Sequence, residues 1–240
     1  MTIGIRIRGA AGNVQIDDTT PIFVVQEQGT ITPANHAPSA GNMFTSRHMV
    51  TFAQVVRTQE PPLIFLRFIT PYVCMCTFTV MGGPGNWTGF NVGAGVWGPN
   101  HNGIDTRPMY CDWFSGIKTP GPSGAKVGIR IRNRVTGAVV FDSGYKIVKF
   151  IQQNAQFNFE SRYTHWVLRY SVGYPSPDAY FLANNLSCII NYYGGTSIQH
   201  MFPSVDPGYP GKLLLYTYSA AGEIPYQTNL WNVLFATPGR

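Results

Sequence analysis

Charged side chains are scarce in this chain, making up only 12% of its 240 residues. Intrinsically disordered chains are usually rich in charge and poor in aromatics, whereas this one is 14% aromatic and 44% hydrophobic, so it can bury a core. It also contains 26 glycines and 18 prolines, and no stretch has the period of an amphipathic helix. The composition is therefore typical of a turn-rich β protein.

Motifs that would support catalysis or metal binding are missing as well. The five histidines are scattered and form no His-Glu-x-x-His pattern, and no serine lies in a Gly-x-Ser-x-Gly motif. A glycosidase needs two carboxylates facing each other across a cleft. No recognisable motif in the sequence contains two such carboxylates, although folding could still bring two of its 11 acidic side chains together. We predict a non-enzymatic protein with no metal ion and no cofactor.

Cysteine is rare, and the spacing of Cys74, Cys76, Cys111 and Cys188 matches no metal-binding motif. Cys74 and Cys76 would lie on the same face of a strand, which is a poor geometry for a disulfide between them. Free thiols fit assembly in a reducing cytoplasm. No apolar run approaches the length of a membrane span, and the first residues already have a strand pattern instead of that of a signal peptide. We expect no membrane insertion.

A short motif, Gly-Ile-Arg-Ile-Arg, occurs twice, at residues 4–8 and 128–132. Isoleucine and arginine alternate in both copies, which is the period of a strand with one buried and one solvated face. Each copy continues through a turn and an apolar run to an aspartate, Asp17 or Asp142. Gly137 in the second turn is free to adopt a positive φ. We therefore predict an internal duplication that forms two equivalent β-hairpins.

In these hairpins we expect the isoleucines to point inward, namely Ile5, Ile7, Ile129 and Ile131. The arginines would then present two guanidinium groups on each hairpin, from Arg6 and Arg8 and from Arg130 and Arg132. The net charge is +6, and such a face is either solvated or docks on an acidic partner. We favour docking by one of the two copies. Basic residues are otherwise sparse and no nucleic-acid-binding module is recognisable, so we expect no nucleic acid partner.

Apolar runs recur at roughly ten-residue spacing with turn residues between them, which predicts an antiparallel β-sandwich or barrel-like all-β fold. The run at residues 63–69 is nearly continuous and is expected to be buried on both faces. A break rich in Gly and Pro at residues 118–125 suggests two units, 1–125 and 126–240, or one fused domain. Trp97 lies in a long Gly/Pro loop and is the best candidate for an exposed contact residue.

The second copy of the motif, with its continuation Val-Val-Phe-Asp-Ser-Gly-Tyr at residues 139–145, resembles a pattern in tail-associated virion proteins of long-tailed bacteriophages. The segments at residues 61–67 and 87–92 follow in the expected order. The resemblance extends over residues 1 to about 150, with a looser likeness beyond.

This resemblance implies a structural part of a phage tail tip, baseplate or fibre, such as a minor tail protein, and it brings no catalytic residues. The expected partners are other phage tail proteins, with the chain oligomeric within the virion after assembly in the host cytoplasm. The alternative is a module at the tail tip that binds a host receptor or carbohydrate. A groove lined by Trp97 and nearby tyrosines would favour this alternative.

Overall fold

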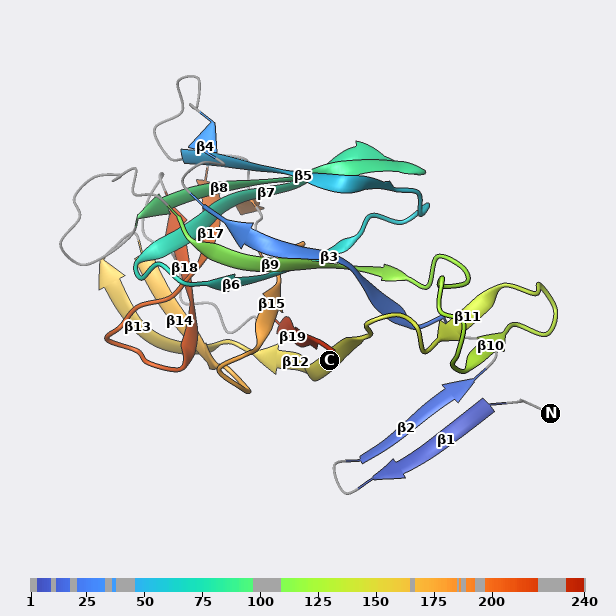
Figure 1. Ribbon diagram of the computed structural model, residues 1–240. Helices are drawn as coiled ribbons and strands as arrows, with labels where there is room; N and C mark the ends of the chain where they lie inside the picture. The colour runs from blue at the N-terminus through green and yellow to red at the C-terminus, as the bar shows by residue number, and fades with distance from the viewer. Residues whose placement is uncertain are drawn as a thin grey trace.

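The computed structural model describes residues 4–9, 12–17, 21–32, 36–37, 46–96, 109–164, 167–184, 186, 189–192, 197–219 and 232–239. All regular secondary structure in these ranges is β, arranged as two separate hairpins and two large sheets (Figure 1). No helix in the described ranges is long and apolar enough to span a membrane. The predicted all-β antiparallel sandwich is thus confirmed.

The first large sheet, here called the curled sheet, has six antiparallel strands. Their spatial order is β12 (Val148–Gln156), β19 (Asn232–Pro238), β15 (Tyr180–Leu182), β6 (Leu63–Phe68), β9 (Cys111–Lys118) and β3 (Phe23–Ile31). Three of these strands precede residue 125 and three follow it. The two predicted units therefore do not form separate sheets.

The second large sheet, here called the flanking sheet, has nine strands. Its order is β13 (Asn158–Thr164), β14 (Val167–Gly173), β18 (Lys212–Ser219), β17 (Ser197–Ser204), β7 (Val73–Gly83), β8 (Asn86–Val96), β5 (Ser46–Val56) and β4 (His36–Ala37), with β16 (Ile189–Tyr192) paired to β17. The separate hairpins are β1 (Gly4–Gly9) with β2 (Gly12–Asp17) and β10 (Arg130–Arg132) with β11 (Val139–Asp142).

The curled sheet bends until its two edge strands meet. Val24 in β3 forms an isolated antiparallel bridge with Ile147, and the Val25 amide donates a hydrogen bond to the Lys146 carbonyl at 2.7 Å. A sheet that bends this far has a convex and a concave face, and both are apolar here. Alternate residues of β6 separate accordingly, with Ile64 in one cluster and Phe65 in another. The predicted two-sided burial of this run is confirmed.

The convex face of the curled sheet packs against the flanking sheet and forms the main core. Trp113 of β9 lies in this layer and is only 5% exposed. Its ring centroid lies 5.2 Å from that of Phe90, in an edge-on arrangement, and 6.2 Å from that of Phe52. Aromatic pairs at these separations add to the stabilisation by burial, so β9 is fixed firmly against β5 and β8.

The concave face holds a smaller aromatic cluster. The rings of Phe65 and Phe114 are stacked with their centroids 4.6 Å apart. Phe150 from edge strand β12 closes over them, with its centroid 6.2 Å from that of Phe65 and 5.8 Å from that of Phe23 in the opposite edge strand. A side chain at Gly116 would meet Val148 at 3.0 Å, so the absence of a Cβ there allows β12 to approach.

The two copies of the repeated motif each lie in an antiparallel hairpin, but their pairing differs. Gly4 lies opposite Asp17 in the first hairpin. In the second, the residue opposite Asp142 is Arg130, two positions beyond the matching Gly128. The predicted equivalence of the hairpins is therefore not confirmed.

The predicted inward orientation is wrong for Ile129, which is 55% exposed. Ile131 is half-buried between the exposed Arg130 and Arg132. β10 and β11 pair only with each other among the described strands, and the apolar side chains that this hairpin buries are those of Val139 and Val140 in β11. The side chains of Ile5 and Ile7 lie outside the described part of the structure.

The concave aromatic cluster gives a direct test of the closed curl. Phe114 is completely buried, so we expect Phe114→Ala to lower the free energy of unfolding by about 3–5 kcal/mol. Phe159→Ala is the matched control because that ring is 38% exposed, and it should cost about 1 kcal/mol. Urea denaturation measures both. Equal losses would mean that the concave face is open to solvent.

Candidate functional site

The segment between β9 and β12 projects from the sandwich at the end opposite β4 (Figure 1). We call residues 119–147 the arm; it contains β10 and β11. Its root is tied to the chain just before β3, because the Thr119 amide donates to the Ile22 carbonyl at 3.0 Å and the Ile22 amide donates to Val140 at 3.1 Å. The curl of the sheet thus holds both ends of the arm together.

A buried carboxylate fixes the arm internally. Asp142 is 2% exposed and accepts hydrogen bonds from the backbone amides of Ser123 and Gly144, both at 2.9 Å. It also accepts from the Ser123 hydroxyl at 2.7 Å and from Arg130 Nε at 2.7 Å. The backbone donors of Gly144 and Ser123, followed by the Ser123 hydroxyl and Arg130, hold the pKa of Asp142 well below its usual range despite burial.

The turn at the tip of the arm is also well ordered by local hydrogen bonds. The Asn133 side-chain oxygen accepts from the amides of Val135 and Thr136 at 2.9 and 2.8 Å. Gly137 has φ of 71°, which confirms the predicted positive φ, and its carbonyl accepts a bond from Arg132 at 3.0 Å. The arm is therefore a defined structural element and not a loose loop.

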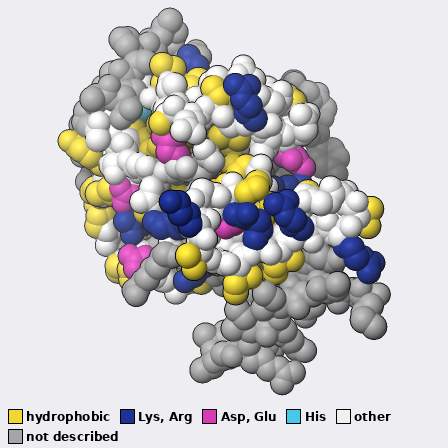
Figure 2. Space-filling view, turned by 45° about the vertical axis from the view of Figure 1, so that its right-hand side comes forward, with side chains coloured by type: hydrophobic (Ala, Val, Ile, Leu, Met, Phe, Trp, Pro, Cys, Tyr) yellow, Lys and Arg dark blue, Asp and Glu magenta, His cyan; other side chains and the backbone are white. Residues whose placement is uncertain are grey.

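The arm exposes aliphatic side chains beside positive charges. Val127 is 90% exposed, Val135 88% and Ile129 55%. The basic residues of the arm are Lys126, Arg130, Arg132, Arg134 and Lys146, and its only acidic residue is Asp142. Because Asp142 is already bound to Arg130, it neutralises none of the others. Figure 2, which turns this end of the molecule forward, shows Lys and Arg side chains across this face, with hydrophobic and some acidic side chains among them.

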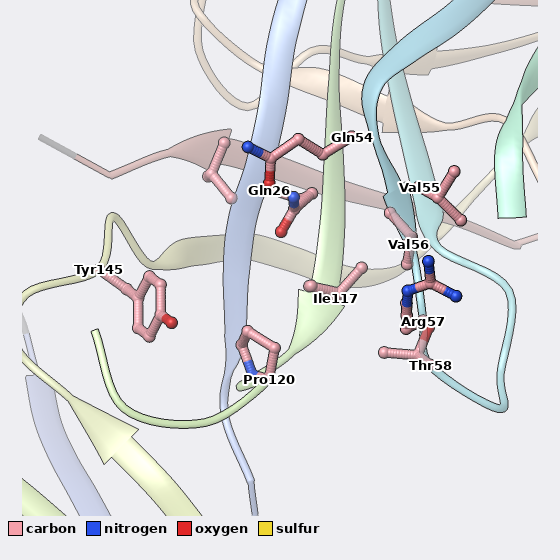
Figure 3. Close-up of a pocket in the computed structure, with 10 residues that line it drawn as sticks. Gln26, Gln54, Val55, Val56, Arg57, Thr58, Ile117, Pro120 and Tyr145 are labelled. Carbon is pink, nitrogen blue, oxygen red and sulfur yellow. The ribbon is translucent and has the colours of Figure 1, made fainter. Parts of the chain in front are cut away.

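A groove of about 510 Å³ lies between the root of the arm and strands β3 and β5. In the close-up, Gln26 and Gln54 lie between Tyr145 of the arm on one side and Arg57 on the other (Figure 3). Beside the groove, the register of β5 against β8 shifts between Thr51 and Val56. A partner side chain could therefore enter beside the arm.

The structure describes the side chains of only some of the predicted contact residues. Arg130 and Arg132 both belong to the arm, and each makes a hydrogen bond within it; their docking role stays a prediction. Arg6 and Arg8 lie in β1, but their side chains are outside the described part of the structure, and so is Trp97. Sequence reasoning missed Asp142 as the anchor, although a lone aspartate before Ser-Gly is a typical signal for such local hydrogen bonding.

No group of three or more His, Cys, Asp or Glu side chains in the described ranges could hold a metal ion. Cys74, Cys76 and Cys111 form no disulfide, and the sulfur atoms of Cys74 and Cys76 lie 3.6 Å apart, which confirms that they share one face of β7. No known protein family, curated protein or solved structure matches the chain. Inferences about function therefore depend on the surfaces described above.

The Asp142 network predicts a specific pH dependence. Because its pKa is lowered by folding, ionised Asp142 stabilises the arm fully above the ordinary aspartate pKa of about 3.9. This stabilisation is lost as the pH falls toward and through the lower pKa of the folded state. At neutral pH, we expect Asp142→Asn to speed amide exchange at Ser123 and Gly144 by about tenfold or more.

Hydrogen exchange followed by NMR measures this effect. The matched control is Asp178→Asn, since the Asp178 side chain is 84% exposed and should leave the arm amides unchanged. The difference between wild type and Asp142→Asn should shrink as the pH is lowered below about 4. Identical exchange rates at neutral pH would contradict the anchoring role.

Proposed function

We propose that this chain is a non-enzymatic structural subunit that docks the arm onto an acidic, partly apolar surface of a neighbouring protein. The observation that carries the proposal is that a hydrogen-bonded arm exposes Val127, Ile129 and Val135 beside Lys126 and Arg134, two exposed basic residues without a partner in the described residues. In line with the sequence resemblance, the assembly is the tail of a bacteriophage, at the tail tip, baseplate or fibre. The neighbours would be other tail proteins, and the site of action is the virion.

The exposed aliphatic residues supply the energetic reason for docking. Burying each of these side chains fully contributes roughly 1.5–3 kcal/mol to the free energy of binding. Single exposed hydrophobic residues are common on protein surfaces, whereas a contiguous apolar patch marks an interaction site. Val127 and Ile129 lie two residues apart beside β10, and Val135 lies at the tip. A partner that covers all three would gain several kcal/mol before any polar contact forms.

The basic side chains decide which partner is preferred. Arg134 and Lys126 are exposed and have no ion-pair or hydrogen-bond partner in the described residues. A guanidinium group presents planar donors that fit carboxylates in bidentate pairs. A complementary acidic surface speeds association and suppresses wrong partners. The arm thus favours a partner rich in Asp and Glu around an apolar centre.

The rigidity of the arm lowers the cost of docking. A flexible loop would lose conformational freedom on binding, whereas the bonds to Asp142 and Asn133 already fix the arm in the free protein. The groove beside Tyr145 adds a concave feature to an otherwise convex element. Together these features form a pre-organised contact surface.

A paired substitution tests the docking role. Arg134→Glu/Val135→Ser reverses one exposed arm charge and removes one exposed arm hydrophobic, so we expect incorporation into assembled particles to fall at least tenfold, because both the charge and the apolar contacts are lost. The matched control is Arg47→Glu/Met49→Ser on β5, which likewise reverses one charge and removes one hydrophobic side chain at two exposed residues outside the arm.

The measurement is the amount of each variant in purified particles, quantified by immunoblot, with thermal unfolding of the isolated chain as the folding check. The expected result is loss of incorporation for the arm variant alone, with unchanged unfolding temperatures. Normal incorporation of the arm variant would overturn the proposal. Equal losses for both variants would show that the arm has no special role.

A further inference from the structure

A second cavity, of about 720 Å³, lies at the end of β6 and β9 that is farthest from the arm. Asp112, the second residue of β9, lines this cavity. The arm starts just after Lys118 at the other end of the same strand, about 20 Å away, and projects from the opposite end of the sandwich (Figure 1). The arm of one chain therefore cannot reach its own cavity.

The charged groups that line the cavity are already paired. Arg67 Nη2 donates to Asp112 Oδ2 at 2.6 Å, and Asp112 Oδ1 accepts from the Thr30 hydroxyl at 2.7 Å. The guanidinium of Arg67 also packs over the Tyr180 ring, 4.9 Å from its centroid. An apolar group can therefore enter the cavity without leaving this ion pair broken.

The rim of the cavity exposes hydrophobic side chains. Ile69 lines the cavity and is 54% exposed. The Ile69 amide donates to the Tyr110 carbonyl at 3.0 Å, which places Tyr110 beside it, and Tyr110 is 44% exposed. Phe68, Pro177 and Val205 continue the apolar wall. A contiguous apolar surface of this kind marks an interaction site.

An exposed carboxylate lies next to this apolar rim. Asp178 follows the lining residue Pro177, and its side chain is 84% exposed. It lies 3.3 Å from Arg67, whereas Arg67 lies closer to Asp112, at 2.6 Å. Lys149 lines the adjoining groove together with Asp178 but does not line the cavity. Because Arg67 and Asp112 neutralise each other, Asp178 can accept a further basic partner at the rim.

The tip of the arm has the complementary features. It is a tight turn, closed by the Gly137 amide donating to the Asn133 carbonyl at 2.8 Å, and at its apex Val135 is 88% exposed. Arg134 beside it is exposed and has no partner in the described residues. We propose that this tip inserts Val135 into the cavity of a second copy of the chain, where Arg134 pairs with Asp178. This inference rests on the docking role of the arm and names its partner.

The contact joins two different surfaces at opposite ends of the molecule, so it is head to tail. Each pair of copies then still has one free arm and one free cavity, and a third copy can add in the same way. Such a contact builds a ring when the rotation between copies closes and a filament when it does not. Association of the chain should therefore continue beyond a dimer.

Sedimentation velocity of the purified full chain tests the proposal. At about 100 μM we expect wild type to form species larger than a dimer. The arm variant Arg134→Glu/Val135→Ser alters the inserting tip, and the cavity variant Ile69→Ser/Asp178→Asn alters the rim that receives it. Each should weaken self-association at least tenfold. The control Arg47→Glu/Met49→Ser lies outside both surfaces and should associate as wild type does, and all unfolding temperatures should stay unchanged.

An equimolar mixture of the two variants gives the sharpest measurement. The arm variant keeps an intact cavity and the cavity variant keeps an intact arm, so the mixture should form a one-to-one dimer and nothing larger. The proposal is overturned if wild type stays monomeric, if the cavity variant associates as tightly as wild type does, or if the mixture either stays monomeric or grows beyond a dimer.

Incorporation into particles separates this proposal from the docking role itself. Loss of the arm variant from particles, with a wild type that is monomeric in solution, overturns self-association and leaves docking of the arm onto a different protein. Normal incorporation of the arm variant, with head-to-tail association measured in solution, overturns the docking role in particles and leaves self-association.

Discussion

Two-sided burial of the curled sheet is the constraint on which the rest of the structure depends. Each strand of this sheet must supply apolar side chains to the main core with one set of alternate residues and to the concave cluster with the other. Phe65 and Ile64 in β6 show the division most clearly, because neighbouring residues belong to different clusters. A sheet covered on one face only would not need to bend, whereas the concave cluster is closed only when the edge strands meet.

The same bend positions the arm. The chain leaves the sheet at the end of β9 and re-enters it at the start of β12, and the bridge between Val24 and Ile147 brings these two points together. Ile22, bonded to both Thr119 and Val140, completes the root. The arm can therefore project from the sandwich and still be held in one direction. Its internal order then depends on Asp142, whose burial would be unfavourable without its four donors.

The two candidate surfaces use charge in opposite ways. In the arm, Arg130 binds the single carboxylate, and the other basic side chains remain exposed. Around Arg67, the positive charge is balanced by Asp112 and Asp178, and the polar groups face an apolar cavity. Local pairing, more than the overall charge of the chain, thus sets the charge of each surface.

Most of the strands could be predicted from period-two patterns and turn residues, but three were missed. β4 has only two residues and lies in a segment rich in Gly, Ala and Pro, which is typical of a loop. β13 and β17 were missed because their sequences are polar or contain proline: β17 includes Pro203 and buries Phe202, and proline normally argues against an interior strand. The candidate site was predicted only in part, since Arg130 and Arg132 were identified but the anchor Asp142, the groove and the cavity around Arg67 were not.

The sequence by itself determined the all-β class, the double burial of the run at residues 63–68 and the positive φ of Gly137, because these follow from local alternation and turn chemistry. Only the tertiary structure decided the pairing register of the second hairpin, the exposure of Ile129 and the meeting of Arg67 with Asp112. Register and exposure depend on which layer covers a strand, and Arg67 and Asp112 lie opposite each other only through the pairing of β6 with β9. No pattern within either strand specifies that partner.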